Sequence, residues 1–263
     1  MTGHDIELDQ SVPSSARVGN KLLGGKDNYD IDKAVASNVS SKLVAAVVEA
    51  RRFLLRAVEC LTNEYAVHQY VELGCGIPLP PHLGDVAGRD LDSARTLYLD
   101  NDPLVAVHAR ALLTTSQNRH FALLDITDTA AVLDKIADDF DLNAPLAICL
   151  SGTAEHLPDA PDVLAELIRG LPPGSWIVFS HVTADVFGGQ IRKSAFGLEH
   201  CGIVYRPRDH DTVTAMLTPY RLLEPGLITP HRWRPDTGDL AHRPQHLAKW
   251  DLSAYAAIGQ LPT

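Results

Sequence analysis

The chain has 263 residues, with 23 Lys and Arg against 33 Asp and Glu, which gives a formal net charge of −10. Its composition, 45% hydrophobic and 21% charged, is that of a globular protein that can bury a core without cross-links. An acidic chain is repelled by phosphate backbones and anionic lipids, so we expect neither nucleic acid nor membrane as a partner. These quantities leave the oligomeric state open.

The N-terminus and the cysteines indicate the compartment. Residues 1–10 contain three acids and no apolar core of a signal peptide. No stretch approaches the roughly 20 apolar residues that span a bilayer. The cysteines, at positions 60, 75, 149 and 201, form no Cys-x-x-Cys pair. We therefore expect buried thiols in a reducing cytoplasm and no metal site.

A long helix is predicted in the first quarter of the chain. Over residues 39–61 the apolar side chains recur at steps of three, four and seven, which form one stripe along a helix. Arg51, Arg52 and Arg56 are assigned to the opposite side and predict a solvated face. The preceding segment, residues 13–32, is rich in Gly, Ser and Asn.

Beyond this helix, short apolar runs alternate with longer helical stretches. Strands are predicted at residues 69–73, 96–100, 120–124, 145–151 and 176–181, with a weaker pair at 213–216 and 220–224. Helices are predicted at residues 104–115, 129–140, 160–170 and 191–202. Strands that alternate with helices form right-handed crossover units. The predicted fold class is therefore α/β, with a mostly parallel Rossmann-like sheet, an antiparallel edge and helices on both faces.

This pattern divides the chain into three parts. We expect an N-terminal helical extension over residues 1–64 and a Rossmann-like domain over residues 65–235. Residues 236–263 are expected to form a C-terminal tail packed on that domain. A helix is predicted within the tail, at residues 247–258.

The first strand of the domain leads into a glycine motif. Gly74 and Gly76 follow the strand that contains Glu72, and a glycine there lets the backbone approach a ligand because it has no Cβ. A dinucleotide-binding fingerprint requires a third glycine three residues later. That position is Leu79, which lies among prolines. The motif therefore disfavours NAD and FAD.

The next strands also end in polar residues. Asp100 and Asn101 follow the second strand, Asp125 and Ile126 the third, and Ser151 ends the fourth. Because the carboxyl ends of parallel strands meet at one edge, we expect these residues beside the glycine loop. An acid at position 100 accepts two ribose hydroxyls, and one at position 125 accepts an adenine amino group while Ile126 packs on the ring. Alternatively, the acids only cap the helices that follow.

A polar pocket of this kind fits a nucleoside that has no phosphate and carries a positive charge. S-adenosylmethionine (SAM) is such a ligand, with Glu72 placed to balance its ammonium or sulfonium charge. Arg17 and Gly25 lie in a segment that would close over it, with Arg17 as a bidentate donor to the SAM carboxylate. Alternatively, Gly25 and the glycine before it only let the N-terminal helices turn.

Segments along most of the chain match the pattern of one known family. The most specific is Leu-Gly-Gly-Lys-Asp-Asn at residues 23–28. The others lie at residues 15–17, 74–78, 98–103, 108–113, 171–175, 180–185, 224–227 and 233–235. From about residue 13 to residue 235, the chain resembles the actinobacterial SAM-dependent methyltransferase family once catalogued as a domain of unknown function, DUF574.

The resemblance implies a class I methyltransferase fold, SAM as cofactor and an N-terminal helical extension over that cofactor. It does not imply a particular acceptor, because the substrates of the family are largely unassigned. The chain departs from the usual family pattern in the loop after the first strand and at residues 151–159. The second departure bears on the acceptor side.

Two histidines are candidates for a general base. His156 follows the fourth strand and His181 lies at the end of the fifth, both at ends that face the expected crevice. A histidine that titrates near neutrality suits proton removal from an oxygen or nitrogen acceptor. Alternatively, each histidine only satisfies loop carbonyls.

Together these observations predict a SAM-dependent methyltransferase that acts on a small-molecule acceptor. The reaction would be an in-line displacement at the sulfonium methyl, for which the protein supplies alignment and a dry cavity. The alternative is a SAM-binding protein that transfers no methyl group, either a ligand sensor or a reused scaffold.

Overall fold

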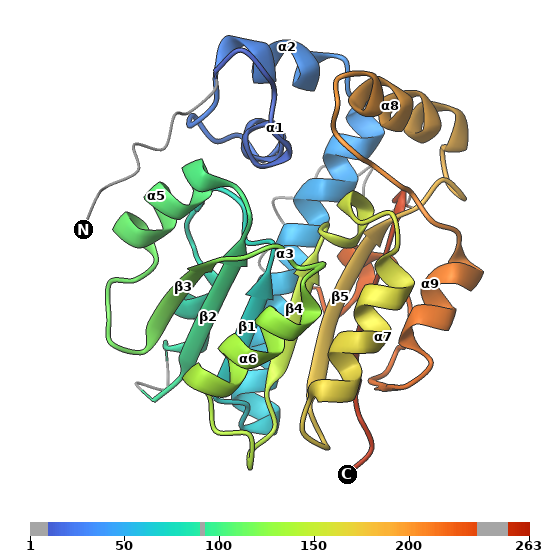
Figure 1. Ribbon diagram of the computed structural model, residues 1–263. Helices are drawn as coiled ribbons and strands as arrows, with labels where there is room; N and C mark the ends of the chain where they lie inside the picture. Colours follow the sequence, from blue (N-terminus) through green and yellow to red (C-terminus); the bar gives the residue numbers. More distant parts are fainter. Residues whose placement is uncertain (1–9, 90–92, 236–251) are drawn as a thin grey trace.

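A seven-stranded sheet lies at the centre of the computed structural model, which describes residues 10–89, 93–235 and 252–263 (Figure 1). Its strands are β1 (Gln69–Leu73), β2 (Arg95–Asp100), β3 (Arg119–Leu123), β4 (Ala147–Ser151), β5 (Trp176–Val182), β6 (Arg221–Leu222) and β7 (Ala254–Gln260). The α-helices are α1 (Ser15–Leu22), α2 (Asp30–Ser37), α3 (Ser41–Tyr65), α4 (Leu83–Ala87), α5 (Pro103–Leu112), α6 (Thr129–Asp139), α7 (Ala160–Gly170), α8 (Gly188–His200) and α9 (His210–Leu217). Two short 3-10 helices, η1 (Ala154–His156) and η2 (Pro230–Arg232), complete the described elements.

The order of the strands is β3-β2-β1-β4-β5-β7-β6. β1 to β5 run parallel, whereas β7 lies antiparallel between β5 and β6. The first five strands begin and end within two residues of their predicted positions. The predicted α/β class, the mostly parallel sheet and its antiparallel edge are therefore confirmed.

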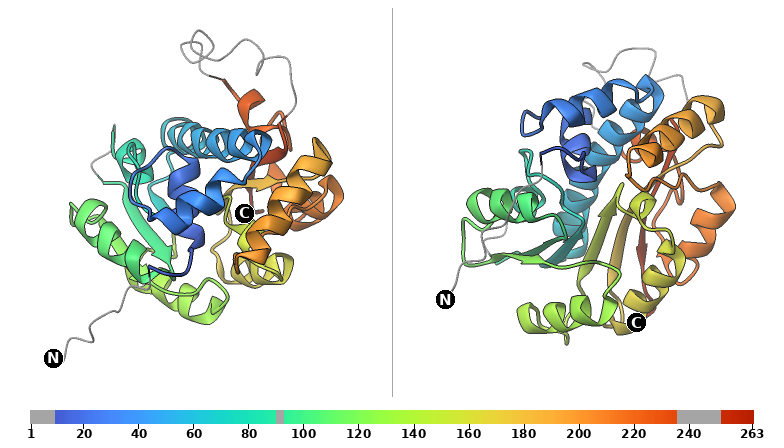
Figure 2. Two further views of the ribbon diagram at one scale, coloured as in Figure 1. Left: turned by 90° about the horizontal axis from the view of Figure 1, so that it is seen from above. Right: turned by 45° about the horizontal axis from the view of Figure 1, so that its top comes forward.

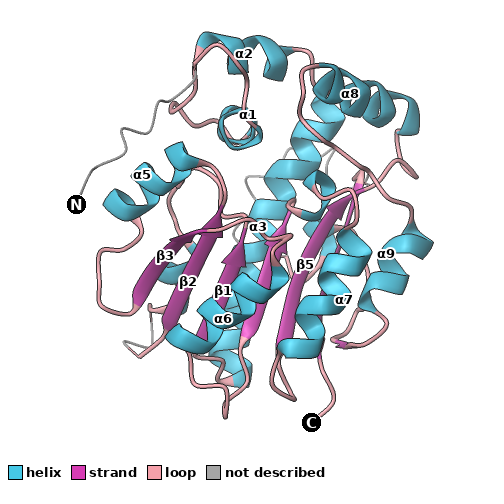
Figure 3. Cartoon of the chain, in the orientation of Figure 1, coloured by secondary structure: helices cyan, strands magenta, loops and turns pink. Residues whose placement is uncertain are grey.

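Helices cover both faces of the sheet (Figure 3). On one face α6, α7 and α9 bury apolar side chains such as Val132, Leu164 and Val213 against the strands. On the other face α3, α4 and α5 do the same, with Phe53 and Leu83 fully buried. The layers leave one edge open, at the carboxyl ends of β1 to β5, and this edge positions the site.

The prediction of a strand at residues 213–216 is wrong, because this segment belongs to helix α9. The side chain of Asp209 caps the helix by accepting the backbone N–H of Thr212 at 2.9 Å. Val213, Met216 and Leu217 then pack on the sheet at helical spacing. The neighbouring strand, predicted at residues 220–224, is confirmed only as the short β6.

The helix predicted at residues 247–258 is also wrong where the structure describes it, since residues 254–260 form β7. Its alanines favour a helix in isolation. However, seven successive residue pairs with β5 hold the segment extended. Gly259 is required here because a Cβ would lie 2.6 Å from the Cβ of Tyr220. Residues 254–260 are thus a strand of the sheet. Residues 236–251 lie outside the described part.

Helix α3 belongs to the layer over the sheet, which divides the predicted extension of residues 1–64 in two. Ser40 caps it by accepting the backbone N–H of Leu43 at 3.3 Å. The prediction of a solvated face is wrong for Arg56, which is buried. Its guanidinium donates to the carbonyl oxygens of Pro230 at 2.7 Å and Trp233 at 3.3 Å. The prediction is right for Arg52, whose side chain is 46% exposed.

Of the predicted extension, α1 and α2 lie over the carboxyl ends of the strands, as the view from above shows (Figure 2). Their apolar side chains, including Val18 and Val35, pack with Leu198 of α8 and Ile203 into a separate cluster at this end of the sheet. Within the described residues, no helix is both long and apolar enough to cross a membrane.

Candidate functional site

A cavity of about 680 Å³ lies at the carboxyl ends of the strands, beneath α1. Its size falls within the roughly 300–1,000 Å³ typical of small-molecule sites. Its wall comes from the loop after β1, the ends of β2 to β5, η1, α1, α3 and the segment after α8. Of the residues predicted from the sequence, the cavity wall contains Arg17, Glu72, Gly74, Gly76, Asp100, Asn101, Asp125, Ile126, Ser151 and His156.

The glycine loop after β1 has the open geometry that the motif predicts. Gly74 and Gly76 adopt φ values of 72° and 63°, which side chains rarely tolerate. A Cβ on Gly74 would lie 2.5 Å from the side chain of Thr153. At Gly76 a Cβ would meet nothing within 4 Å, so the backbone there borders empty space in the cavity.

Asp100 joins this loop to the end of β2. One carboxylate oxygen accepts the N–H of Gly76 at 2.8 Å and the other that of Asp102 at 3.0 Å. Burial raises the pKa of Asp100 to about 6, although these two hydrogen bonds act against it. The helix-capping alternative does not apply, because the side chain of Asp102 caps α5 by accepting the N–H of Leu104.

Asp125 and Ile126 lie at the end of β3, the neighbouring strand. Asp125 accepts the backbone N–H of Thr127 at 2.9 Å, its hydroxyl at 2.7 Å and the amide of Asn101 at 3.0 Å. These bonds lower the pKa of Asp125, with the backbone N–H of Thr127 as the largest cause. The cap of α6 is Asp128 and not Asp125. Ile126 is buried and forms an apolar part of the wall.

Glu72, near the end of β1, is paired with a residue that the sequence analysis placed on a solvated face. Nη1 of Arg51 lies 2.9 Å from Oε1 of Glu72, and Nη2 donates to the carbonyl oxygen of Pro81 at 3.1 Å. Burial raises the pKa of Glu72, and Arg51 partly opposes that rise. A signal for Arg51 was present, because it follows Val47 by four residues and precedes Leu54 by three, which places all three on one side of a helix.

Arg17 lies in the cavity wall, but its guanidinium is already paired with an acid of the protein. The guanidinium Nε lies 2.9 Å from Oδ2 of Asp32, and both side chains are at most 5% exposed. It also lies over the ring of Tyr29, 4.9 Å from the centroid, and donates to the carbonyl oxygen of Val12. Arg17 therefore fastens α1 to α2 above the cavity.

Gly25 does not line the cavity, so its predicted contact with the cofactor is not supported by its position. Its N–H donates to the carbonyl oxygen of Asn20 at 2.8 Å, and its own carbonyl accepts the amide of Asn28 at 3.1 Å. A Cβ would lie 2.3 Å from the side-chain nitrogen of Asn20. The close turn between α1 and α2 explains this glycine, in line with the second reading of the motif.

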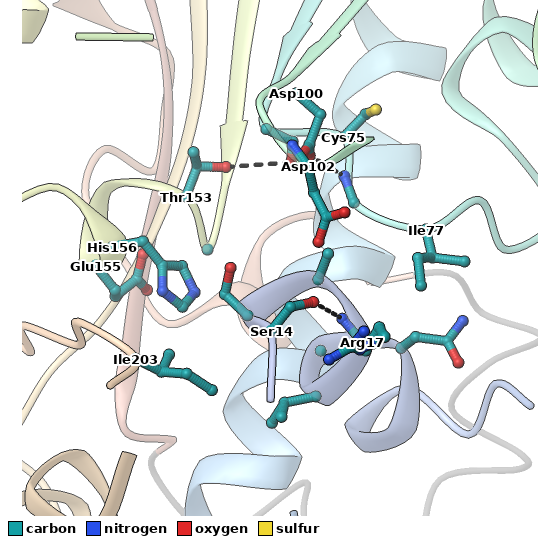
Figure 4. Close-up of a pocket in the computed structure, with 18 of the residues that line it drawn as sticks. Ser14, Arg17, Cys75, Ile77, Asp100, Asp102, Thr153, Glu155, His156 and Ile203 are labelled. Carbon is teal, nitrogen blue, oxygen red and sulfur yellow. Dashed lines mark hydrogen bonds between the residues drawn. The ribbon is translucent and has the colours of Figure 1, made fainter. Parts of the chain in front are cut away.

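His156 reaches the cavity from η1 (Figure 4). Its Nδ1 lies 2.8 Å from the carbonyl oxygen of Val204. Because a carbonyl only accepts, Nδ1 carries the proton and Nε2 of the neutral ring keeps a lone pair. Burial lowers the pKa of His156, which favours this neutral form.

His181 is not among the residues that line the cavity, so its position does not support the predicted role as a general base. The residue is 1% exposed, and its Nε2 donates to the carbonyl oxygen of Arg206 at 3.2 Å. Its Nδ1 lies 3.4 Å from Oε2 of the fully buried Glu155. Burial raises the pKa of Glu155, but His181 and the N–H of Val182 outweigh that effect. His181 is thus a core histidine that satisfies a loop carbonyl.

Ser151 and Thr153 complete the wall at the end of β4. Ser151 accepts the hydroxyl of Ser180 at 3.3 Å. Thr153 donates its hydroxyl to the carbonyl oxygen of Leu73 at 2.8 Å, which links η1 to the glycine loop. Ile203 and Tyr205 also line the cavity, and they were not predicted because they belong to an irregular segment with no strand-end signal.

Comparison with known proteins decides the family. The model of the family described as S-adenosyl methyltransferase matches residues 1–262. The chain belongs to this family. The predicted cofactor, SAM, and the predicted enzyme class, a SAM-dependent methyltransferase, are thereby confirmed. Among curated proteins, none matches the sequence.

Solved structures of similar proteins agree with this S-adenosyl methyltransferase assignment. A DUF574 family protein from Streptomyces avermitilis MA-4680 is 28% identical, with a TM-score of 0.88 over 97% of this chain and 99% of its own. A protein from Thermobifida fusca YX, described as a candidate methyltransferase, is 30% identical with a TM-score of 0.87 over 97% of each chain. The N-methyltransferase NodS from Bradyrhizobium japonicum WM9, bound to S-adenosylhomocysteine, shares the fold at 13% identity and a TM-score of 0.51, over 94% of this chain and all of its own.

The cavity of this S-adenosyl methyltransferase fits SAM on its own geometry. The empty space beside Gly76 admits a ligand against the backbone. Asp100 and Asp125 offer carboxylate oxygens to donor groups, and the two cations in the wall, Arg17 and Arg51, are held by acids of the protein. The wall is therefore suited to a nucleoside without phosphates.

Proposed function

We propose that this chain transfers the methyl group of SAM to a small-molecule acceptor bound in the same cavity. The observation that carries the proposal is the position of His156. This residue, with an unprotonated Nε2, lines the same cavity as the residues proposed to hold SAM. A cavity of about 680 Å³ covered by α1 suits a small molecule. The net charge of −10 disfavours a nucleic acid.

The strand order supports an orientation for the cofactor. In this proposal Asp125 and Ile126 at β3 hold the adenine, and Asp100 at β2 holds the ribose. Glu72 at β1 accepts the ammonium group. Because β4 lies on the other side of β1 from β2, the methyl end points toward η1, which carries His156.

The residues of the chain then have distinct tasks. Bound SAM supplies a methyl group already activated by a cationic sulfur. His156 holds the acceptor and removes its proton, a contribution of about 10²–10⁴-fold to a rate. The backbone of Gly74 and Gly76 and the carboxylate of Asp100 align the cofactor, and α1 excludes water.

The proposed location is the cytoplasm. The four cysteines are free thiols. Burial raises the pKa of Cys75 and of Cys149 well above the usual value, which keeps both thiols protonated and unreactive. Unpaired, unreactive thiols of this kind are typical of a reducing compartment.

Incubation with SAM labelled in the methyl group and a cell extract tests the proposal. We expect label to leave SAM and to enter the small-molecule fraction rather than protein or RNA. His156→Gln should lose at least about a hundredfold of this activity while it still binds SAM. His210→Gln, a change in an exposed histidine of α9, is the matched control and should keep the activity. SAM binding without any transfer would favour a sensor or scaffold instead.

A further inference from the structure

The cavity has two halves of different chemistry, and the second half identifies the class of acceptor. The half at β1 to β3 contains the carboxylates of Glu72, Asp100, Asp102 and Asp125. The other half is apolar and joins α1, α3, β5, α8 and the segment after α8. Its side chains are Val18, Val47, Val182, Leu198, Ile203 and Tyr205. Figure 4 shows His156 and Ile203 on the opposite side of the cavity from Asp100 and Asp102.

Charged groups near the apolar half are already compensated. Glu155 is fully buried, and one of its carboxylate oxygens lies beside Nδ1 of His181. The other oxygen accepts the N–H of Val182 at 2.5 Å. The guanidinium groups of Arg17 and Arg51 are ion-paired with acids of the protein. A charged acceptor in this half would therefore lose its hydration without gaining an opposite charge from the side chains that line it, which is costly.

His156 reaches the cavity wall from η1, on the side of Ile203 (Figure 4). Its Nε2 carries a lone pair, because Nδ1 donates to Val204. A partner for this nitrogen must have a proton to donate. A phenolic hydroxyl, with a pKa of about 10 as in tyrosine, gives up its proton to an imidazole far more readily than an aliphatic alcohol does.

We propose that the acceptor is a neutral, mainly apolar aromatic molecule that presents one phenolic hydroxyl to Nε2 of His156. This inference rests on the proposed function and specifies its substrate class. The aromatic ring lies against Val47, Leu198 and Ile203. The edge-to-face contact of His156 with Tyr205, at 5.2 Å between centroids, holds the imidazole in place beside that ring.

The step balances without any further reactant. The oxygen of the acceptor forms a bond to the methyl carbon with its own electron pair, and the electron pair of the broken carbon–sulfur bond remains on sulfur. Nε2 of His156 takes the hydroxyl proton and becomes an imidazolium, which later returns the proton to solvent. The products are an aryl methyl ether and S-adenosylhomocysteine.

Binding to the wild-type protein provides the first test. Calorimetry on protein saturated with S-adenosylhomocysteine compares three probes of one shape: 2-naphthol, 2-naphthoate and protonated 2-(aminomethyl)naphthalene. We expect 2-naphthol to bind at least tenfold more tightly than either ion. Equal or tighter binding of an ion, or no binding of 2-naphthol, would overturn the inference. Failure of S-adenosylhomocysteine itself to bind would instead reject the proposed function.

A pair of variants locates the probe. Val47→Asp places a charge in the apolar half and should weaken 2-naphthol binding at least tenfold, with the affinity for S-adenosylhomocysteine unchanged within twofold. The control is Val107→Asp on α5, a residue that is 50% exposed and outside the cavity wall, and it should change neither affinity. Equal 2-naphthol affinity in both variants would contradict the placement.

The reaction provides the last test. Labelled SAM and 2-naphthol should yield labelled 2-methoxynaphthalene with the wild-type protein. His156→Gln should lose the product but still bind 2-naphthol within tenfold. Tight binding of 2-naphthol without methyl transfer by the wild type would show that the hydroxyl does not face His156 and would overturn the inference.

Discussion

The two halves of the cavity differ in how the chain builds them. The half at β1 to β3 is made of residues at successive strand ends, such as Asp100 and Asp125, which the parallel sheet brings together by its topology alone. The apolar half is assembled from α1, α3, α8, the end of β5 and the segment that contains Ile203. The first half is thus a property of the fold, whereas the second depends on the packing of helices far apart in the chain.

The largest expected effect lies in the half at the strand ends. Asp100→Ala removes a charged acceptor for two ribose hydroxyls, at about 1.5–3 kcal/mol for each charged hydrogen bond. SAM affinity should therefore fall at least about a hundredfold, measured by calorimetry. Asp128→Ala removes only the cap of α6 and should lower stability by about 1 kcal/mol without a change in affinity. Unchanged SAM affinity in Asp100→Ala would mean that the ribose lies elsewhere.

Arg51 forms an ion pair with Glu72, and its removal leaves Glu72 buried without this partner. Arg51→Met should cost about 3 kcal/mol of unfolding free energy in denaturant titrations, the lower end for a buried pair because the Arg51 side chain is 20% exposed. The double variant Arg51→Met/Glu72→Gln should recover most of this loss. The exposed pair of Arg89 and Glu59 is the control, and Arg89→Met should cost less than about 1 kcal/mol. No recovery in the double variant would argue against the pair as the cause.

The helices that cover the cavity, α1 and α2, can be deleted while the sheet and α3 are kept. Since α2 ends at Ser37, deletion of residues 1–38 takes away α1 and α2 and leaves α3 in place. We expect near-native far-UV circular dichroism and a loss of SAM affinity of at least roughly tenfold, or ~1.4 kcal/mol. Unfolding on truncation would make the segment part of the core, and full affinity would mean that it does not close the site.

The smallest effect is a pH dependence. Burial raises the pKa of Asp100 to about 6, so SAM affinity should be constant above pH 6 and fall up to about tenfold per pH unit below it, as the carboxylate is protonated. The raised pKa means that the folded chain binds this proton more tightly than the unfolded chain. The ligand-free protein should therefore lose stability from this group as the pH rises from about 4 to about 6. Asp100→Asn should remove both dependences, and a persistent slope in affinity would point to another group.

The contrast also explains what was predictable from the sequence. β1 to β5 and the residues at their ends were predicted because apolar runs and the polar residues that follow them are local signals. β7 was missed because its alanines suggest a helix and only pairing with β5 keeps it extended. For His181, a strand-end position does not reveal that the carbonyl oxygen of Arg206 and the carboxylate of Glu155 lie against the ring.

The contacts between distant segments around the cavity were the least predictable. Arg51 was predicted to face solvent because it is charged, although its spacing from Val47 and Leu54 places it on the buried side of the helix. There it pairs with Glu72. Ile203 and Tyr205 follow no periodic pattern, and only the cluster formed by α1, α2 and α8 brings them to the cavity. Local sequence patterns do not predict contacts of this kind between distant segments.

A crystal structure of the complex with S-adenosylhomocysteine would test the central claim, the division of the cavity, most directly. We predict the ribose hydroxyls on Asp100, the adenine beside Asp125 and Ile126, and the sulfur directed toward His156, with the apolar half left open for the acceptor. Adenine seated against Leu198 and Ile203, with the sulfur turned away from His156, would contradict the account.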